Sequence, residues 1–206
     1  VVFWMILSGE SQADIYKVRR DGSGLTNLTD SPAAIDFDPA WSRDGARIAF
    51  ISNIGSPNRF VLKTMNADGG DVKTVHDPVE AIATERFPPG VYDPSWSPDG
   101  SAILVDQPVS FTGDGENGAA GVWHTLKIRA DGSQIVDLSQ AGGHADGAEY
   151  LPSFSPDGGS LVLSIREGPE DPAGVSLHIY RMNSEGGELQ RLTDSPAWDE
   201  FAVWIG

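Results

Sequence analysis

Acidic side chains recur at one place in this 206-residue chain, close to the start of a repeated segment that also carries an aromatic residue. The acids at this place are Asp36, Asp38, Asp93, Glu149, Asp199 and Glu200. If the repeated segments surround one axis, these carboxylates converge at the mouth of a narrow channel. Several carboxylate oxygens close together suit a hard cation such as Ca²⁺, whereas crowded carboxylates without a cation repel each other. The pattern therefore predicts a channel cation as the cofactor.

Histidines give a second set of candidate metal ligands. His144 and Asp146 fall close to Glu149, and His76 stands beside Asp77. A histidine with carboxylates can bind a transition metal and activate water, which is the chemistry of a metal-assisted hydrolase or lyase. No spacing of serine, histidine and aspartate indicates a catalytic triad, and the chain has no cysteine to act as a nucleophile. Metal-assisted catalysis is therefore the alternative to a binding role.

The repeated segment that must position these residues appears three times with little change. Residues 38–45 read DPAWSRDG, residues 93–100 read DPSWSPDG and residues 151–158 read LPSFSPDG. Each Ser-X-Asp-Gly is a tight turn whose glycine can take a positive φ, and the apolar run after it predicts a buried strand. A period of about 50 to 60 residues, built from short strands and tight turns, is typical of a β-propeller.

A further strand, ending in Asp-Gly or Glu-Gly, sets the number of repeats. It occurs four times, before Gly22, Gly69, Gly132 and Gly186. The chain begins with a second strand at 2–7 and ends with a first strand at 201–205, and pairing the two would remove exposed strand edges. We therefore expect an all-β single domain over residues 1–206. It is a four-bladed β-propeller of four-stranded antiparallel blades, whose closing blade is shared between the N-terminal strands and the C-terminal strand.

Charge and composition narrow the choice of partners. The chain has 30 acidic and 14 basic residues and a net charge of −16, which argues against nucleic acid as a partner. No apolar run approaches the roughly 18 residues that span a bilayer, so membrane insertion is not expected. The longer loops, expected on one face, carry most of the acids but only Arg59, Arg86 and Arg166 of the basic residues. A protein or basic ligand at this acidic loop face is the expected partner.

Aromatic residues are also expected on the acidic loop face. They are Phe60, Phe87, Tyr92, Phe111 and Tyr150. Large rings beside loops can form a docking surface for a protein. The alternative is that Tyr92 and Tyr150 cover the ends of the core.

The segments DPAWSRDG and DPSWSPDG, followed by an apolar strand, an Asp-Gly turn and Leu-Thr, resemble the TolB-like, WD40-like (PD40) β-propeller repeat. The resemblance covers nearly the whole chain and is weakest at the last copy, residues 201–204. It implies that the aromatic residue of each copy packs between blades; these residues are Trp41, Trp96, Phe154 and Trp204. It also implies an alternative for the leading acids, which in the family can hydrogen-bond amides of the neighbouring blade. A periplasmic or secreted location is favoured by the resemblance.

The family's function does not transfer directly. Its members are usually six-bladed with an additional domain, and the same repeat forms the gating propeller of prolyl-oligopeptidase-like enzymes. This chain offers four blades and lacks the Gly-x-Ser-x-Gly motif of a hydrolase domain. We therefore expect a non-catalytic binding or interaction propeller with an acidic loop face. Its channel acids either hold a cation such as Ca²⁺ or serve the hydrogen bonds to the neighbouring blade that the resemblance implies. The alternatives are a metal-assisted hydrolase or lyase at the mouth of the channel, and a structural module of a larger protein.

Overall fold

The computed structural model confirms an all-β fold. It describes residues 1–7, 12–53, 55, 59–78, 88–111, 121–167, 176–194 and 198–204. No helix within these ranges is long and apolar enough to cross a membrane.

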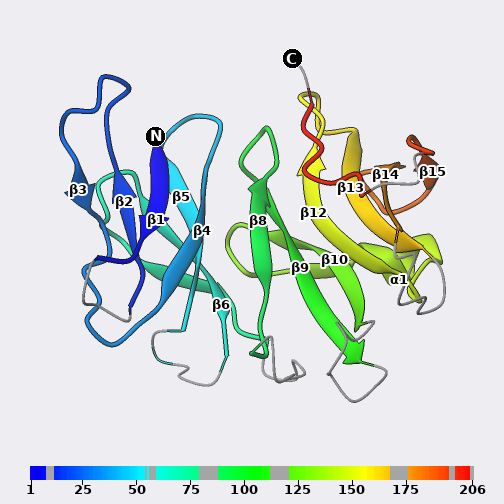
Figure 1. Cartoon of the computed structure of the whole chain (residues 1–206), viewed down its shortest axis with the longest axis horizontal. Helices are drawn as coiled ribbons and strands as arrows, with labels where there is room; N and C mark the ends of the chain where they lie inside the picture. The colour runs from blue at the N-terminus through cyan, green and yellow to red at the C-terminus, as the bar shows by residue number, and fades with distance from the viewer. Residues whose placement is uncertain are drawn as a thin grey trace.

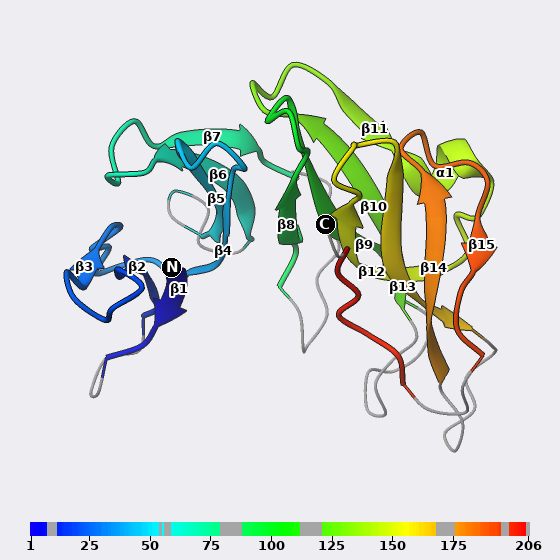
Figure 2. The ribbon, with the colours of Figure 1, turned by 90° about the horizontal axis from the view of Figure 1, so that it is seen from above.

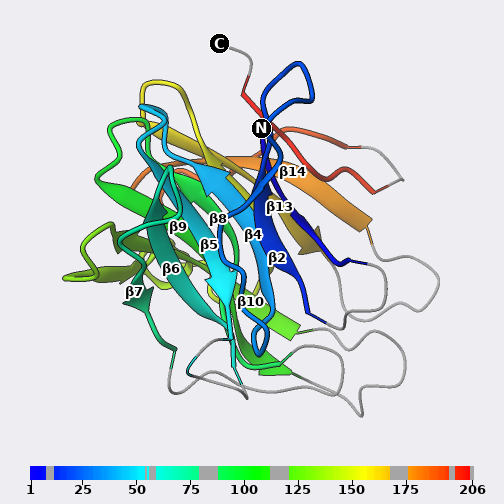
Figure 3. The same cartoon turned by 90° about the vertical axis from the view of Figure 1, so that its left-hand side faces the viewer.

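The first half of the chain forms two sheets (Figure 1). The first sheet holds β1 (Val2–Met5), β2 (Asp14–Lys17) and β3 (Thr26–Asn27) in that order. The second sheet holds β4 (Asp36–Trp41), β5 (Arg47–Ser52), β6 (Val61–Asn66) and β7 (Lys73–His76), which lie side by side in Figure 3. All neighbouring strands within these two sheets are antiparallel. The apolar run predicted after the first Ser-X-Asp-Gly turn is β5.

The second half of the chain forms one sheet of eight strands. Its first part, called the third sheet here, holds β8 (Tyr92–Trp96), β9 (Ala102–Phe111), β10 (Gly121–Arg129) and β11 (Ile135–Asp137). Its second part, the fourth sheet, holds β12 (Ala148–Phe154), β13 (Ser160–Glu167), β14 (Ser176–Asn183) and β15 (Gln190–Arg191), and the short helix α1 (Leu138–Gly142) precedes it. A single parallel pair, Trp123 with Ala148, joins the two parts. The predicted repeats are therefore present, and a parallel bridge connects the last two.

One backbone feature marks the equivalent position in every repeat. Asp38, Asp93, Leu151 and Phe201 all have a positive φ, between 47° and 61°. Each of these residues stands three positions before the aromatic residue of its copy. The degraded last copy therefore keeps the backbone conformation of the others. The predicted equivalence of residues 201–204 with the earlier first strands is supported by this shared geometry.

The last copy also keeps its contact with the sheet before it. Trp96 donates its indole N–H to the carbonyl of Ala40, at 3.1 Å, and Trp204 donates to the carbonyl of Ser153, at 3.3 Å. Ala40 and Ser153 hold the same position in their copies, directly before the aromatic residue. Residues 198–204 therefore lie beside β12 as β8 lies beside β4, but they form no strand.

The ring does not close as expected. Figure 2 shows the sheets following one another along an arc, with the first sheet at one end and the fourth at the other. Within the described ranges, no strand pairing joins the C-terminal segment to β1. The four-bladed closed ring is therefore not confirmed, and the expected shared closing blade is absent from the described part. Residues 201–204 contact the fourth sheet through Trp204, and within the described ranges no pairing joins them to β1.

Apolar clusters fill the seams between successive sheets. The first seam packs Ile15 against Ile48, Phe50 and Met65, with Trp41 at its margin. The second and third seams each contain a larger buried group, which includes Trp96 in the second and has Phe154 packed against it in the third. The prediction that Trp41, Trp96 and Phe154 pack between sheets is confirmed, and Trp204 is half-buried against β12.

The Ser-X-Asp-Gly turns repeat in atomic detail. In each, the aspartate accepts a hydrogen bond from the serine two residues earlier and from the amide two residues later. These aspartates are Asp44, Asp99 and Asp157. The following glycines have φ of 70°, 69° and 76°, which only glycine adopts without strain. Local sequence is therefore sufficient to build these turns.

Candidate functional site

Five of the six acids predicted to surround the channel fall into two sets. Each copy has one non-glycine residue with a positive φ, and the position two residues before it holds Asp36, Glu149 and Asp199 in three of the copies. In the third sheet this position is Val91. Asp93 is instead equivalent to Asp38, two residues later. The expectation that Asp36, Asp93, Glu149 and Asp199 are equivalent is therefore wrong, because it counted Asp93 in the wrong set.

The first set lies in the seams between sheets. Asp36 is 1% exposed and its carboxyl bonds Ser52 and Thr29. Glu149 is fully buried, and His144 Nδ1 lies 2.5 Å from its Oε1. These carboxyls have separate side-chain partners, and burial raises the pKa of Asp36. They are not brought together around the axis.

Asp199 and Glu200, the last two predicted ligands, lie on the C-terminal segment. The Oδ2 atom of Asp199 is 3.6 Å from Nδ1 of His178. The Asp199 amide donates to the carbonyl of Leu177, as the Asp36 amide donates to that of Ala13. Asp199 is therefore a seam residue like Asp36. Glu200 is exposed.

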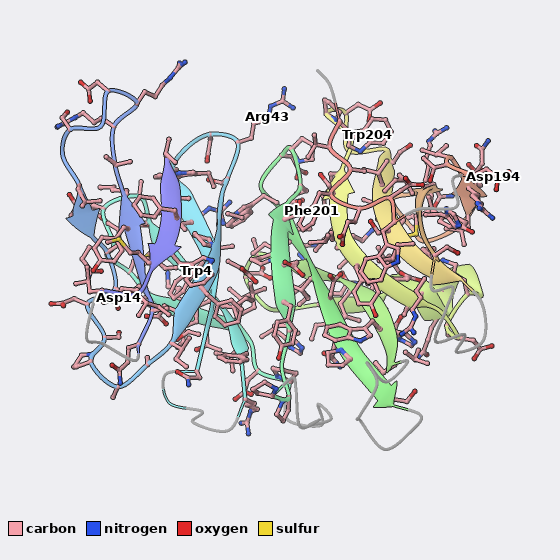
Figure 4. All side chains as sticks on the ribbon, in the orientation of Figure 1. Trp4, Asp14, Arg43, Asp194, Phe201 and Trp204 are labelled. Carbon is pink, nitrogen blue, oxygen red and sulfur yellow. The ribbon has the colours of Figure 1, made fainter. Side chains whose placement is uncertain are left out.

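The second set, Asp38 and Asp93, lines a groove at the inner edge of the sheets. This axial groove has a volume of about 290 Å³. Its walls are Asp38, Pro39, Asp93, Pro94, Ser95, Leu151, Pro152, Ser153, Phe201, Ala202 and Val203. All four positive-φ residues line it. Figure 4 shows Phe201 and Trp204 on the C-terminal segment that forms one side of it.

Sequence reasoning missed a third acid beside this groove. Asp106 ends the apolar run of β9 and is fully buried. Its Oδ2 accepts the Leu151 amide at 2.8 Å, and its carboxyl contacts that of Asp93. An acid that ends an otherwise apolar strand is the signal that could have found it. Together Asp38, Asp93, Asp106 and Glu149 form what we call the acid row, which runs from β4 to β12.

Burial dominates the electrostatics of the acid row. It raises the pKa of Asp38 to about 6, with a further contribution from the negative charge of Asp93. Burial likewise raises the pKa of Asp93. The pKa of Asp106 lies well above its usual value, first because of burial and then because of the Asp93 carboxylate. Among the described residues, no Lys or Arg side chain forms an ion pair with Asp38, Asp93 or Asp106.

The two histidines of the predicted metal site lie in different seams. His76 is on β7 and its Nε2 is 3.5 Å from Oε1 of Gln107. His144 contacts Glu149 and, through Nε2, the carbonyl of Gly186 at 2.9 Å. Asp146 is exposed. Within the described ranges, no three His, Asp or Glu side chains are grouped so as to hold a metal ion.

Comparisons with known proteins agree with this repeat geometry. The chain is 30% identical over 172 residues to the uncharacterized peptidase YuxL of Bacillus subtilis, covering 70% of this chain and 24% of that protein. It is 44% identical over 57 residues to a TolB homolog of Chlorobium luteolum, covering 27% of this chain and 13% of that protein. TolB from Acinetobacter baumannii has the same fold, with a TM-score of 0.68 at 16% identity, over 96% of this chain and 42% of that chain. No protein-family model matches.

The repeats belong to the TolB-like propeller family. The chain spans about a quarter of the peptidase YuxL, at 24% of its length, and less than half of the Acinetobacter TolB chain, at 42%. The TolB-like repeats thus establish the architecture of this chain and leave its ligand to be argued from the site.

The aromatic side chains of these TolB-like repeats form a row across three sheets. Ring centroids are 4.8 Å apart for Phe37 and Phe60, 5.9 Å for Phe60 and Tyr92, 5.5 Å for Tyr92 and Trp123, and 5.4 Å for Trp123 and Tyr150. Tyr92 is only 8% exposed, and the rings of Phe60 and Tyr150 are half-buried. This row therefore ties three sheets together. Phe87 and the side chain of Phe111 lie outside the described residues.

Proposed function

We propose that this chain is a non-catalytic binding propeller whose axial groove and acidic loop face take a basic ligand or the basic segment of a partner protein. One observation carries the proposal. Asp38 and Asp93 line the groove, and no Lys or Arg among the described residues pairs with them. The acids of the longer loops are expected to supply the rest of the acidic surface, because loops on a rigid scaffold are where binding groups usually lie.

The physical argument concerns the cost of uncompensated charge. Carboxylates that are partly removed from water and lack a counter-charge favour any cation that can approach them. Asp38 and Asp93 interact electrostatically, and the net charge of the chain is −16. A Lys or Arg side chain of a partner would relieve both the repulsion and the desolvation. Acidic partners would be repelled.

The test is binding of a fluorescent decalysine peptide, followed by anisotropy at neutral pH. We expect affinity to fall steeply between about 50 and about 500 mM salt, because the attraction is between charges. The double variant Asp38→Asn/Asp93→Asn should bind about tenfold more weakly. Asp146→Asn removes one exposed charge outside the groove and is the matched control. Salt-independent binding, or an unchanged affinity in the double variant, would contradict the proposal.

A hydrolytic role is the second candidate, and the similarity to the peptidase YuxL favours it. The chain covers only 24% of that protein, so the propeller can belong to an enzyme without holding its catalytic groups. We expect the chain alone to release no product from peptide p-nitroanilides, with or without added Zn²⁺ or Mn²⁺. Turnover that EDTA abolishes would instead support the metal-assisted hydrolase or lyase.

The channel cation stays a prediction. A bound cation stabilises the folded state by mass action, so added Ca²⁺ should raise the melting temperature and EDTA should lower it. Identical melting curves in Ca²⁺ and in EDTA would exclude Ca²⁺ as a cofactor of this chain.

A further inference from the structure

One backbone contact is common to all three seams of the arc. The glycine of the turn before the outer strand of one sheet lies against a backbone carbonyl of the preceding sheet, so close that a Cβ on it would clash with the carbonyl oxygen. The pairs are Gly69 with Leu28, Gly132 with Val75 and Gly186 with Leu138. Each carbonyl residue lies in or just beyond the outer strand of its own sheet. A seam therefore has a glycine side and a carbonyl side.

The two ends of the arc each carry one of these sides without the other. Gly22, in the turn before β3, is the matching glycine of the first sheet; it has a φ of 82°, and a Cβ on it would meet no atom of the described residues within 4 Å. Leu192, just beyond β15, is the matching carbonyl residue of the fourth sheet and is exposed. The first sheet thus presents a glycine side and the fourth sheet a carbonyl side, at opposite ends of the arc (Figure 2).

The inner strands show the same division. The strands β5, β9 and β13 each pair with the inner strand of their own sheet, which is β4, β8 or β12. The corresponding strand of the first sheet is β1, and in the described part of the chain it pairs with β2 alone. Residues 201–204 keep the backbone conformation and the tryptophan contact of an inner strand, yet no second strand pairs with them there. Each of these segments lacks the partner that the other would supply.

The outer face of the fourth sheet is an apolar groove. Leucines of β13 point into the third seam, so Val162 between them points the other way. Together with Ile179 and Leu192 it lines a groove of about 440 Å³, which the C-terminal segment borders at Val203. The corresponding residues of the second sheet are packed against the third sheet; they are Ala49, Leu62 and Val75. The groove is therefore the face on which a further sheet of this repeat would pack.

The outer face of the first sheet is apolar as well. Val2 packs against the cluster of the first seam, so its neighbours Val1 and Phe3 point away from that seam. The Phe3 ring stacks on Tyr16 of the paired strand with centroids 6.1 Å apart, and Val1 is 66% exposed. Two apolar faces of this kind are stabilised when each removes the other from water.

A side-chain contact repeats across the seams in the same way. Lys17 and Lys127 each donate through Nζ, at 2.7 Å, to a carbonyl in the glycine turn of the next sheet. Arg181 holds the corresponding position in the fourth sheet and lines the groove there. The corresponding turn carbonyl of the first sheet is that of Arg20. The fourth sheet therefore carries a donor, and the first sheet an acceptor, for a contact that two seams already make.

We propose that the first sheet of one copy of this chain docks on the fourth sheet of a second copy, head to tail, with residues 201–204 of the second copy as the inner strand beside β1 of the first. Gly22 then lies on Leu192 as Gly69 lies on Leu28. Because the two surfaces differ and every copy carries both, the contact is heterologous and repeats until a ring closes. This inference goes beyond the binding role, because it concerns the partner of the end sheets and not the ligand of the axial groove.

Sedimentation velocity tests the association. We expect the weight-average mass at about 200 µM to be at least about twice that at about 2 µM, because association follows mass action. Each copy has a net charge of −16, so copies repel each other and about 500 mM salt should strengthen the association. Decalysine binding to the axial groove should weaken in the same salt, so the two proposals can fail independently. The mass of a single chain at about 200 µM in low and in high salt would overturn the proposal.

Gly22→Asn blocks the glycine side of the seam. Asparagine tolerates a positive φ and the space around Gly22 is open, so the variant should fold and stay a monomer at about 200 µM. Gly45→Asn is the matched control: its φ is 70°, the space around it is also open, and it lies in the second sheet. It should associate as wild type does. Equal association of the two variants would contradict the proposed seam.

A second variant blocks the other side and reveals the arrangement. Leu192→Asp places a charge at an exposed position of the fourth sheet and should also stay a monomer. Mixed with Gly22→Asn it should form dimers and nothing larger at about 200 µM, because one variant keeps an intact fourth sheet and the other an intact first sheet. A mixture that stays monomeric, or a dimer of one variant alone, would overturn the head-to-tail arrangement.

Discussion

The second and third seams are built from the same repeat and hold their sheets together differently. In the second seam, Ile51 faces the third sheet from within a wholly apolar cluster. In the third seam, the equivalent position is Asp106. Ile51 pairs with Phe37 and Asp106 pairs with Tyr92, and each of these partners directly precedes a residue with a positive φ. One side chain thus replaces hydrophobic packing with a hydrogen bond from the Leu151 amide to a buried carboxyl. A repeat can keep its backbone while the chemistry of each seam changes.

Placing an aspartate of the third-seam type in the second seam gives the largest expected effect on stability. Ile51 is fully buried, and the side chains of its cluster are apolar. Ile51→Asp therefore places a carboxyl where the cluster offers it no free hydrogen-bond donor. We expect a loss of about 4 kcal/mol in the free energy of unfolding, measured by urea denaturation. Ile51→Val, the matched control, should cost about 1 kcal/mol. If Ile51→Asp cost no more than Ile51→Val, the two seams would not differ as described.

The pH dependence of stability should come next in size. Burial raises the pKa of Asp38 to about 6, and it raises the pKa of Asp106 well above its usual value. A raised folded-state pKa contributes stability that is complete below the unfolded value and is lost as the pH rises through the folded value. The free energy of unfolding should therefore fall by about 2 kcal/mol from about pH 4 to about pH 7. Urea titrations across this range measure it; a stability that rises over the interval would contradict the assignment.

Arg47 tests the second seam at its outer edge. Its guanidinium lies 4.4 Å from the Trp96 ring centroid and donates to the carbonyl of Gly100 at 2.7 Å. Arg47→Met keeps the apolar stem and removes both contacts, which should cost about 1 kcal/mol at any pH between about 5 and about 8. Thermal melts at the two pH values provide the measurement. A cost that changed with pH would mean that the second seam also contains a titrating contact.

The smallest effect is expected at Asp146, which is exposed in the link beside the third seam. Asp146→Asn should change the free energy of unfolding by less than about 0.5 kcal/mol. Urea denaturation is again the measurement. A larger change would show that lying beside the third seam, without being buried in it, is enough to affect the free energy of unfolding.

The fold followed from the sequence wherever short-range chemistry decides it. The Ser-X-Asp-Gly turns formed as predicted, because each depends on the hydrogen bonds of its aspartate and the positive φ of its glycine, all within a few residues. The apolar runs after them became buried strands. The candidate site was predicted less well. The acids were recognised, but Asp93 was aligned with the wrong neighbours and Asp106 was missed, because a buried acid pair depends on which strands face each other.

Sequence alone determined the repeats, their turns and the aromatic residue that enters each seam, since all three depend on periodicity and local conformation. Only the tertiary structure decided that the sheets form an open arc, because curvature depends on how every seam packs. It also decided which carboxyls meet. Asp93 and Asp106 meet through the pairing of β8 with β9, and only the packing of the third sheet on the fourth brings the Leu151 amide to Asp106.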